Sequence, residues 1–140
     1  MATRSTIAIE NLDGTVSQVY CHWDGYLEGV GKTLLTHYNT REAVEKLISG
    51  GAISSLGTYV SDEKEPFDRV LDGEDYTVFY SYRGENVVIN KFTSLERYEE
   101  SHNYEEFEYI FTKDDVWSVF QSEDWDDLEY VLENNKDLTS

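Results

Sequence analysis

The pattern of apolar and polar residues near the start of the chain predicts a β-hairpin. Residues 6–9 and 15–21 are rich in β-branched and aromatic side chains, and Asn11-Leu12-Asp13-Gly14 separates them. An Asp-Gly turn between two such runs is among the stronger short-range hairpin signals. The N-terminus is therefore expected to form two antiparallel strands.

The same reasoning predicts two more hairpins further along the chain. One has strands at 76–82 and 86–92, joined by Arg83-Gly84-Glu85. The other has strands at 104–112 and 116–121, joined around Lys113-Asp114-Asp115. Between the first two hairpins, residues 53–60 are expected to form a short strand or irregular packing, and residues 62–75 a loop that contains the chain's one proline.

Apolar residues recur with helical spacing in the middle of the chain. Residues 32–38 are expected to form a short helix after a loop at 25–31. Asn39 and Glu42 have the spacing of a capping box and should open a second helix. Gly50-Gly51 should end it, because glycine favours the position just past a helix C-terminus.

Residues 94–101 predict a helical turn, and Ser122 is expected to cap a last amphipathic helix. The apolar stripe of that helix would consist of Trp125, Leu128, Val131 and Leu132. The predicted fold class is therefore α+β. It has a largely antiparallel sheet built from about three hairpins, two central short helices and a C-terminal amphipathic helix. Its length of 140 residues predicts a single domain spanning residues 1–140.

The net charge of −18 is distributed unevenly along the chain. Residues 1–61 contain six acidic and four basic residues, a net charge of −2, whereas residues 62–140 contain 23 acidic and seven basic residues, a net charge of −16. Such a field repels nucleic acid and anionic membranes and attracts basic protein surfaces. Direct binding to nucleic acid is therefore excluded, and no membrane association is expected.

The single cysteine, Cys21, cannot form an internal disulfide, and this is typical of a reducing compartment. The N-terminal residues lead into no apolar signal segment, and no apolar run approaches the ~20 residues of a membrane span. We therefore expect a cytoplasmic protein. No cofactor is expected.

The stretch from Val19 to Tyr26 brings unusual residue types together where a strand gives way to a loop. Strand alternation places Cys21 and Trp23 in the core and His22 and Asp24 on the opposite face. A small-molecule, nucleotide or metal site at this loop is one hypothesis for function. Its residues would be His22, Asp24, Tyr26, Lys32 and His37.

The acidic half of the chain gives the main functional hypothesis, which is binding to a basic protein surface. On the predicted strand at 104–112, Glu106 and Glu108 share a face with their side-chain roots about 6.7 Å apart. This spacing is similar to that of successive phosphates along a DNA strand. The partner-binding residues would be Glu99, Glu100, Glu105, Glu106, Glu108, Tyr109, Asp114, Asp115, Trp117, Asp126, Asp127, Glu129 and Tyr130.

Three segments near the N-terminus resemble the opening of small uncharacterised proteins of bacteriophages and bacterial mobile elements. They are Arg4-Ser5-Thr6-Ile7, Asp13-Gly14-Thr15-Val16 and Tyr20-Cys21-His22-Trp23-Asp24-Gly25-Tyr26. The resemblance extends over residues 4 to about 57. It implies a phage protein expressed in a bacterial host, and it assigns no activity or site residue.

Together these observations predict a phage-encoded inhibitor that is not an enzyme. It would bind a restriction-type, CRISPR-type or other nucleic-acid-handling protein through an acidic surface that mimics nucleic acid. The alternatives are the ligand site at the His22–Lys32 loop and a structural role as a homo-oligomer. The sequence leaves the oligomeric state open.

Overall fold

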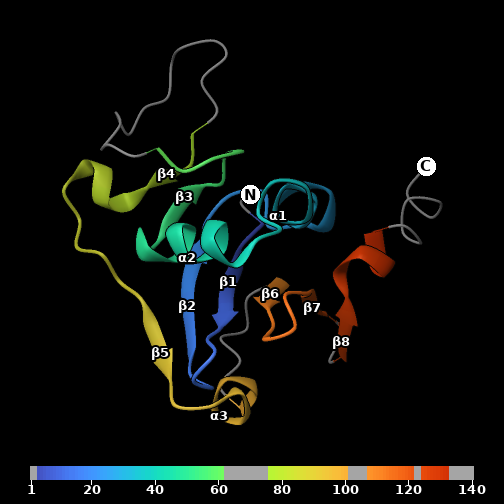
Figure 1. Cartoon of the computed structure of the whole chain (residues 1–140). Helices are drawn as coiled ribbons and strands as arrows, with labels where there is room; N and C mark the ends of the chain where they lie inside the picture. Colours follow the sequence, from blue (N-terminus) through green and yellow to red (C-terminus); the bar gives the residue numbers. More distant parts are fainter. Residues whose placement is uncertain (1–2, 62–75, 101–106, 122–123, 133–140) are drawn as a thin grey trace.

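The computed structural model describes residues 3–61, 76–100, 107–121 and 124–132 of the chain (Figure 1). It has an α+β fold, as predicted, with one mixed sheet and helices on both of its faces. The described strands are β1 (Ser5–Glu10), β2 (Val16–Cys21), β3 (Ile53–Ser55), β4 (Val78–Phe79), β5 (Asn90–Phe92), β6 (Phe107–Phe111), β7 (Trp117–Gln121) and β8 (Asp124–Asp127). The predicted loop at 62–75 lies outside the described residues.

The strand order is β4-β3-β2-β1-β6-β7-β8, and β5 pairs with part of β2. The hairpins β1–β2 and β6–β7 are antiparallel, which confirms the first and third predicted hairpins. Their first strands, β1 and β6, pair in parallel with Ser5 opposite Phe107 and Ile9 opposite Phe111. The two hairpins therefore lie side by side, and both turns are at the same end of the sheet.

Helical segments connect and cover the strands. They are a π-helical turn η1 (Leu27–Gly31), α1 (Lys32–His37), α2 (Arg41–Ser49), a 3₁₀ turn η2 (Tyr80–Arg83) and α3 (Leu95–Glu100), and residues 128–132 are helical after β8. The predicted loop at 25–31 is wrong over 27–31, because η1 continues directly into α1. In the part of the chain that the structure describes, no helix has the length and apolar character needed to cross a membrane.

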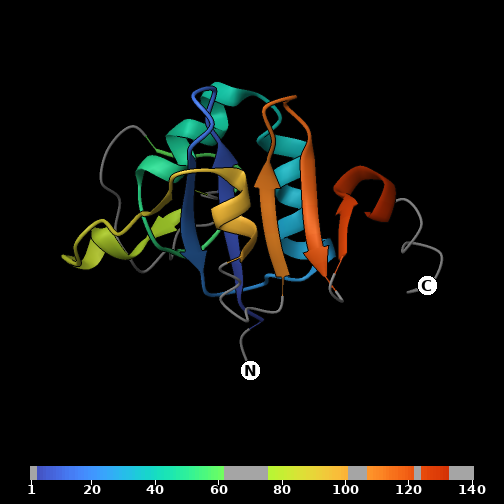
Figure 2. The same cartoon turned by 90° about the horizontal axis from the view of Figure 1, so that it is seen from below.

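Two apolar layers hold the helices to the sheet (Figure 2). On one face, α1 and α2 bury Leu34 and Leu47 against a layer that includes Ile7 and Ile9 of β1. On the other face, α3 lies over the sheet and buries Tyr98. The residues beneath Tyr98 on that face include Ala8, Val16 and Ile110. The central strands are thus covered on both sides.

The second predicted hairpin is wrong. Val78 and Phe79 pair with β3, and Tyr80–Arg83 then forms η2, which ends at Gly84 in the left-handed region. This turn directs the chain away from β4. The next strand, β5, instead pairs with the edge of β2 next to β3.

Two helix starts also differ from the prediction. Thr40, not Asn39, caps α2, because the Thr40 hydroxyl accepts a hydrogen bond from the backbone N–H of Ala43 at 3.2 Å. The last helix begins five residues later than expected, after the pairing of β8 with β7. There the Asp127 carboxylate accepts from the N–H of Tyr130 at 3.0 Å, whereas the predicted cap, Ser122, lies outside the described residues.

Gly51 provides a test of how tightly α2 and the chain before β5 are packed. Gly51 has φ +82°, and a Cβ there would lie 2.9 Å from Val87 Cγ1 and from the Val88 nitrogen. Gly84 has a similar φ of +96° but nothing within 4 Å of a Cβ. We expect Gly84→Ala to lower the free energy of unfolding by about 1–2 kcal/mol, the cost of the left-handed backbone alone.

Gly51→Ala should lower the free energy of unfolding by a further 1–3 kcal/mol, roughly the cost of overpacking. Urea titrations monitored by tryptophan fluorescence measure both values. Equal losses in the two variants would show that the contact between Gly51 and residues 87–88 does not constrain the fold.

Candidate binding groove

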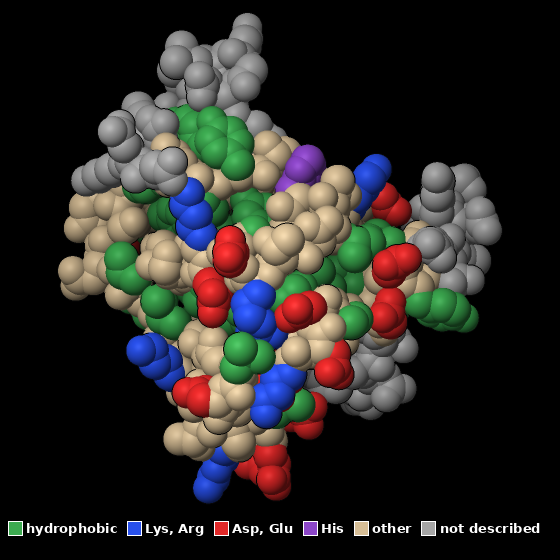
Figure 3. Space-filling model, viewed as in Figure 1, with side chains coloured by type: hydrophobic (Ala, Val, Ile, Leu, Met, Phe, Trp, Pro, Cys, Tyr) green, Lys and Arg blue, Asp and Glu red, His purple; other side chains and the backbone are tan. Residues whose placement is uncertain are grey.

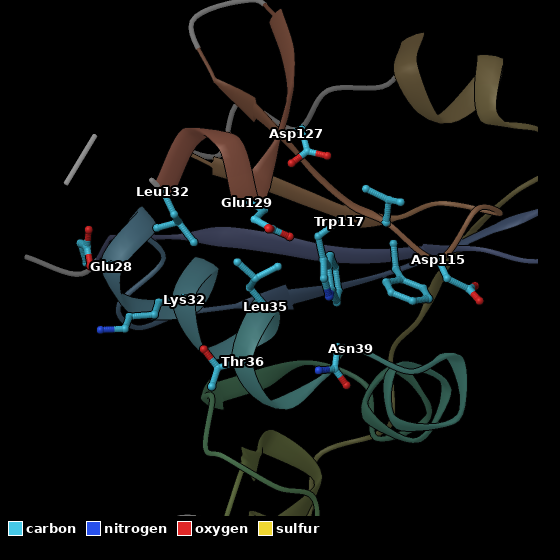
Figure 4. Close-up of a pocket in the computed structure, with 12 residues that line it drawn as sticks. Glu28, Lys32, Leu35, Thr36, Asn39, Asp115, Trp117, Asp127, Glu129 and Leu132 are labelled. Atoms are coloured by element: carbon cyan, nitrogen blue, oxygen red, sulfur yellow. The ribbon is translucent and has the colours of Figure 1, made fainter. Parts of the chain in front are cut away.

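A groove with a volume of about 580 Å³ lies between α1 and the strands at the β8 end of the sheet (Figure 4). One wall is formed by η1 and α1, the floor by the β6–β7 hairpin, and the other wall by Asp127 and the helix at 128–132. Its lining residues are Glu28, Lys32, Leu35, Thr36, Asn39, Phe111, Asp115, Val116, Trp117, Asp127, Glu129 and Leu132. The volume is within the range of sites that hold small ligands or several side chains of a partner.

The lining combines carboxylates with an apolar floor. Glu28, Asp115, Asp127 and Glu129 supply four acidic groups, and Lys32 is the single base among the described lining residues. Figure 3 shows the same character from outside, with acidic side chains around apolar ones on the side of β8. A surface of this kind favours a ligand that has both a positive charge and an apolar stem.

The charges are not evenly placed within the groove. In Figure 4, the Glu129 carboxylate points toward Trp117, above the middle of the groove. Lys32 extends away from Trp117, on the side of Glu28. The centre of the groove is therefore acidic and apolar, and the one lysine lies at its margin.

Arg41 holds the Asp115 end of the groove. Its guanidinium donates to the carbonyl of Glu10 at 3.0 Å and to the carbonyl of Thr112 at 2.9 Å, and it pairs with the Asp115 carboxylate at 3.0 Å. It also lies over the Phe111 ring, 5.4 Å from the centroid. Arg41 thus joins the start of α2 to both hairpins and fixes one wall of the groove.

The floor is fixed by a second set of hydrogen bonds. The indole N–H of Trp117 donates to the carbonyl of Tyr38 at 2.8 Å, and the Trp117 ring meets Phe111 edge to face at 5.2 Å. The Tyr38 hydroxyl in turn donates to the carbonyl of Gly57 at 2.8 Å. Because the Trp117 N–H is used inside the protein, the indole serves as a rigid floor.

Several predicted partner-binding residues lie at the surface. Asp115, Asp127 and Glu129 line the groove, and the predicted contacts Glu99, Glu100, Asp114 and Tyr130 are exposed elsewhere. Glu99 and Glu100 are on α3, across the sheet from the groove. Glu105 and Glu106 lie outside the described residues, as does the side chain of Asp126.

Three predicted contact residues are buried, and their assignment to the surface is wrong. Glu108 is 2% exposed, Tyr109 is fully buried, and Trp117 is 3% exposed. The reason is topological. Glu108 and Tyr109 are on β6, which lies inside the sheet between β1 and β7 and is covered on both faces, and Trp117 is on β7, which lies between β6 and β8. Glu108 therefore cannot be part of an acidic binding row along this strand.

The residues of the alternative ligand site do not come together in this groove. Lys32 lines the groove, whereas His22, Asp24, Tyr26 and His37 do not. Nδ1 of His22 is 2.7 Å from the hydroxyl of Tyr20, and its ring meets the Trp23 ring edge to face. Among the described residues, no three His, Cys, Asp or Glu side chains are placed to hold a metal ion.

Cys21 is buried as predicted, but Trp23 is 46% exposed. β2 ends at Cys21, so the alternation that would have buried Trp23 stops there. Burial raises the pKa of the Cys21 thiol from 9.0 to about 12, because the thiolate would be desolvated. A thiol of this kind is a poor nucleophile at neutral pH.

Sequence reasoning missed Glu28, Leu35, Thr36, Asn39 and Leu132 as lining residues. They come from two parts of the chain that the β1–β6 pairing brings together, and neither part contains a sequence motif that identifies them as ligand-binding residues. Sequence reasoning did not identify a role for Arg41 either. A base in the first turn of a helix ordinarily interacts unfavourably with the helix dipole, so the sequence did not indicate a stabilising residue there. Only knowledge of the strand order would have identified them.

Replacing Arg41 tests whether its contacts hold the groove. Lysine keeps the charge but cannot reach two carbonyls and a carboxylate together, so Arg41→Lys should lower the free energy of unfolding by about 1–3 kcal/mol. The matched control is Arg97→Lys, because Arg97 is exposed and its pair with Glu100 is 3.9 Å long. That change should cost less than about 0.5 kcal/mol. Equal effects in urea titrations would contradict the role of Arg41.

Buried acidic protons predict a loss of stability at high pH. Burial raises the pKa values of Cys21, Tyr98 and Tyr109 above their ordinary values of 9.0 and 10.0, so the folded protein retains protons that the unfolded chain releases. These groups do not affect stability below about pH 8, and above about pH 9 each lowers it by up to about 1.4 kcal/mol per pH unit.

Urea titrations between pH 8 and 11 measure this slope. Cys21→Ala should make the fall in the free energy of unfolding with pH less steep, by the equivalent of about one proton released on unfolding, because the substitution removes one of the three groups. A free energy of unfolding that stays constant from pH 8 to 11 would contradict the burial of these three protons.

In comparisons with known proteins, no family model matches the chain, and neither a curated protein nor a solved structure gives a match. The groove and the charge of the chain are therefore the features that bear on its function.

Proposed function

We propose that this protein acts by binding a basic segment of another protein in the groove between α1 and the helix at 128–132. In the phage setting implied by its N-terminal resemblance, the partner is a bacterial defence or nucleic-acid-handling protein. Binding blocks the partner's basic surface in the cytoplasm of the host. The protein then acts as an inhibitor and not as an enzyme.

The observation that carries this proposal is the combination of acidic rim and apolar floor. Glu28, Asp127 and Glu129 surround a floor that includes Leu35, and the buried Trp117 lies in the apolar cluster behind it. Interfaces commonly combine a desolvated aromatic centre with a polar rim. A basic side chain of a partner meets both requirements of this surface.

The global charge supports the same type of partner. A net charge of −18 accelerates the approach of a basic protein and repels free nucleic acid. Association should therefore be fast and should weaken as salt is added. The repulsion also opposes a homo-oligomer that pairs two acidic halves.

Nucleic-acid mimicry by a row of carboxylates on β6 is not part of the proposal. Glu108, which would belong to that row, is buried. The inhibitor competes instead by occupying basic residues that the partner uses for nucleic acid. A ligand site at the His22–Lys32 loop is likewise not favoured, because only Lys32 of its five residues lines the groove.

The test is inhibition of a defined defence system in bacteria. The chain is expressed in strains that each carry one restriction or CRISPR system, and the plating efficiency of a challenge phage is counted. We expect plating to rise in the strain whose system is bound. The variant Glu28→Lys/Glu129→Lys should return plating to the level without the protein, and it should lower capture of the purified partner by at least about tenfold.

Two further charge reversals separate the groove from the rest of the acidic surface. Glu42→Lys/Glu45→Lys changes the same charge on exposed positions of α2 and should retain inhibition. Glu99→Lys/Glu100→Lys makes the change on α3, across the sheet. Loss of inhibition only in the α3 variant would show that the interface lies on α3 and not at the groove. If the unmodified chain affected no system, the inhibitor proposal would be contradicted.

A further inference from the structure

We infer that the centre of the groove is a receptor for the side chain of one arginine of the partner. This inference rests on the proposed function and specifies which residue type the groove selects. The receptor consists of the Glu129 carboxylate and the apolar side chains of Leu35, Val116 and Leu132, and Leu35 and Leu132 pack against the apolar cluster that contains the buried Trp117.

The protein contains an internal example of the same recognition. At the Asp115 end, the Arg41 guanidinium lies over an aromatic ring of the floor and pairs with a carboxylate of the rim. This arrangement uses Phe111 and Asp115, and Arg41 itself is largely buried, with 15% of its side chain exposed. The neighbouring part of the groove offers Glu129 beside apolar side chains, but no base of the described lining lies over it.

The apolar lining explains why the ligand must carry more than a charge. Val116 is 42% exposed, and Leu35 and Leu132 are partly buried, so apolar surface remains accessible beside Glu129. The methylene groups of an arginine or lysine can cover such a surface while the charged end reaches a carboxylate. A small inorganic cation would leave this surface exposed to water.

Arginine is favoured over lysine for two reasons. Its planar guanidinium pairs with a carboxylate through two parallel hydrogen bonds and loses less hydration than an ammonium when it enters a groove. The volume of about 580 Å³ accommodates the arginine with the residues on either side of it.

Nuclear magnetic resonance on the full chain tests this inference without the natural partner. The probe is an acetylated and amidated heptapeptide of glycine and alanine with arginine at its centre. Two control peptides carry lysine or citrulline there, and citrulline keeps the shape of arginine without its charge. The observed signal is the indole N–H of Trp117, with the indole of Trp23 as an internal reference outside the groove.

We expect saturable shifts of the Trp117 signal with the arginine peptide and none with the citrulline peptide. The lysine peptide should bind at least about threefold more weakly, because it lacks the bidentate contact. Trp23 should not shift with any of them. Equal shifts with the arginine and citrulline peptides would overturn the inference.

Two variants locate the binding. Glu129→Gln removes the central charge and should weaken the arginine peptide at least about fivefold, whereas Glu99→Gln, an equal charge change on α3, should alter it less than about twofold. Thr36→Tyr fills the groove from the exposed side of α1 without changing the charge and should abolish binding. Each variant must keep the dispersed spectrum of the folded chain.

The outcomes separate this inference from the proposed function. If Glu129→Gln and Glu99→Gln weaken the peptide equally, the protein attracts cations through its overall field and has no arginine receptor. If the receptor is present but no defence system is inhibited, the inhibitor proposal fails and the receptor stands. If inhibition occurs but Thr36→Tyr retains it, the partner binds outside the groove.

Discussion

The three-way contact of Arg41 is the interaction on which the arrangement of this protein depends. Arg41 is the first helical residue of α2. Its guanidinium donates to the carbonyl of Glu10 and to the carbonyl of Thr112, which lie at the turns of two separate hairpins. These two turns have equivalent geometry, with a residue at positive φ in each, Gly14 in one and Asp115 in the other. Aspartate is one of the few residues that tolerate this backbone, and here its carboxylate also pairs with Arg41.

This contact explains why the groove has a defined shape. The parallel pairing of β1 and β6 is made between segments about 100 residues apart, and it receives no help from a short connecting turn. Arg41 stabilises this pairing at the end where both hairpins turn. The hydrogen bond from the Trp117 indole N–H to the Tyr38 carbonyl holds the end of α1 against β7. The α1 wall and the floor of the groove are thus held together, which favours binding with little loss of conformational freedom.

Local patterns predicted much of this fold and little of the site. The Asp-Gly turn predicted the first hairpin, and the apolar spacing predicted α2, because both signals come from neighbouring residues. The burial of β6 could not be predicted. The alternation of apolar and polar residues along a strand shows that it has two faces, but it does not show whether another element of the fold covers each face. Glu108 illustrates this limit, since a glutamate on a strand is ordinarily expected at the surface.

The strand order gathers the strands of the near-neutral half in the middle of the sheet. β1–β3 come from that half, whereas β6, β7 and β8 on one side of them and β4 and β5 on the other come from residues 62–140. On one side the sheet ends at the edge strand β8, whose sequence is Asp124-Trp125-Asp126-Asp127. Charge on an edge strand hinders pairing with other chains, so these aspartates have a use that requires no partner.

Glu129 differs from the aspartates of β8 because it follows the strand and faces the groove floor in place of the strand edge. Protection of the edge does not require a carboxylate at that position. It also does not require that Lys32 point away from Trp117, or that the Trp117 N–H be bonded within the protein. The charge of β8 thus has an explanation in the protection of the sheet edge, whereas the placement of Glu129 toward the groove floor is accounted for by the cationic ligand that we propose.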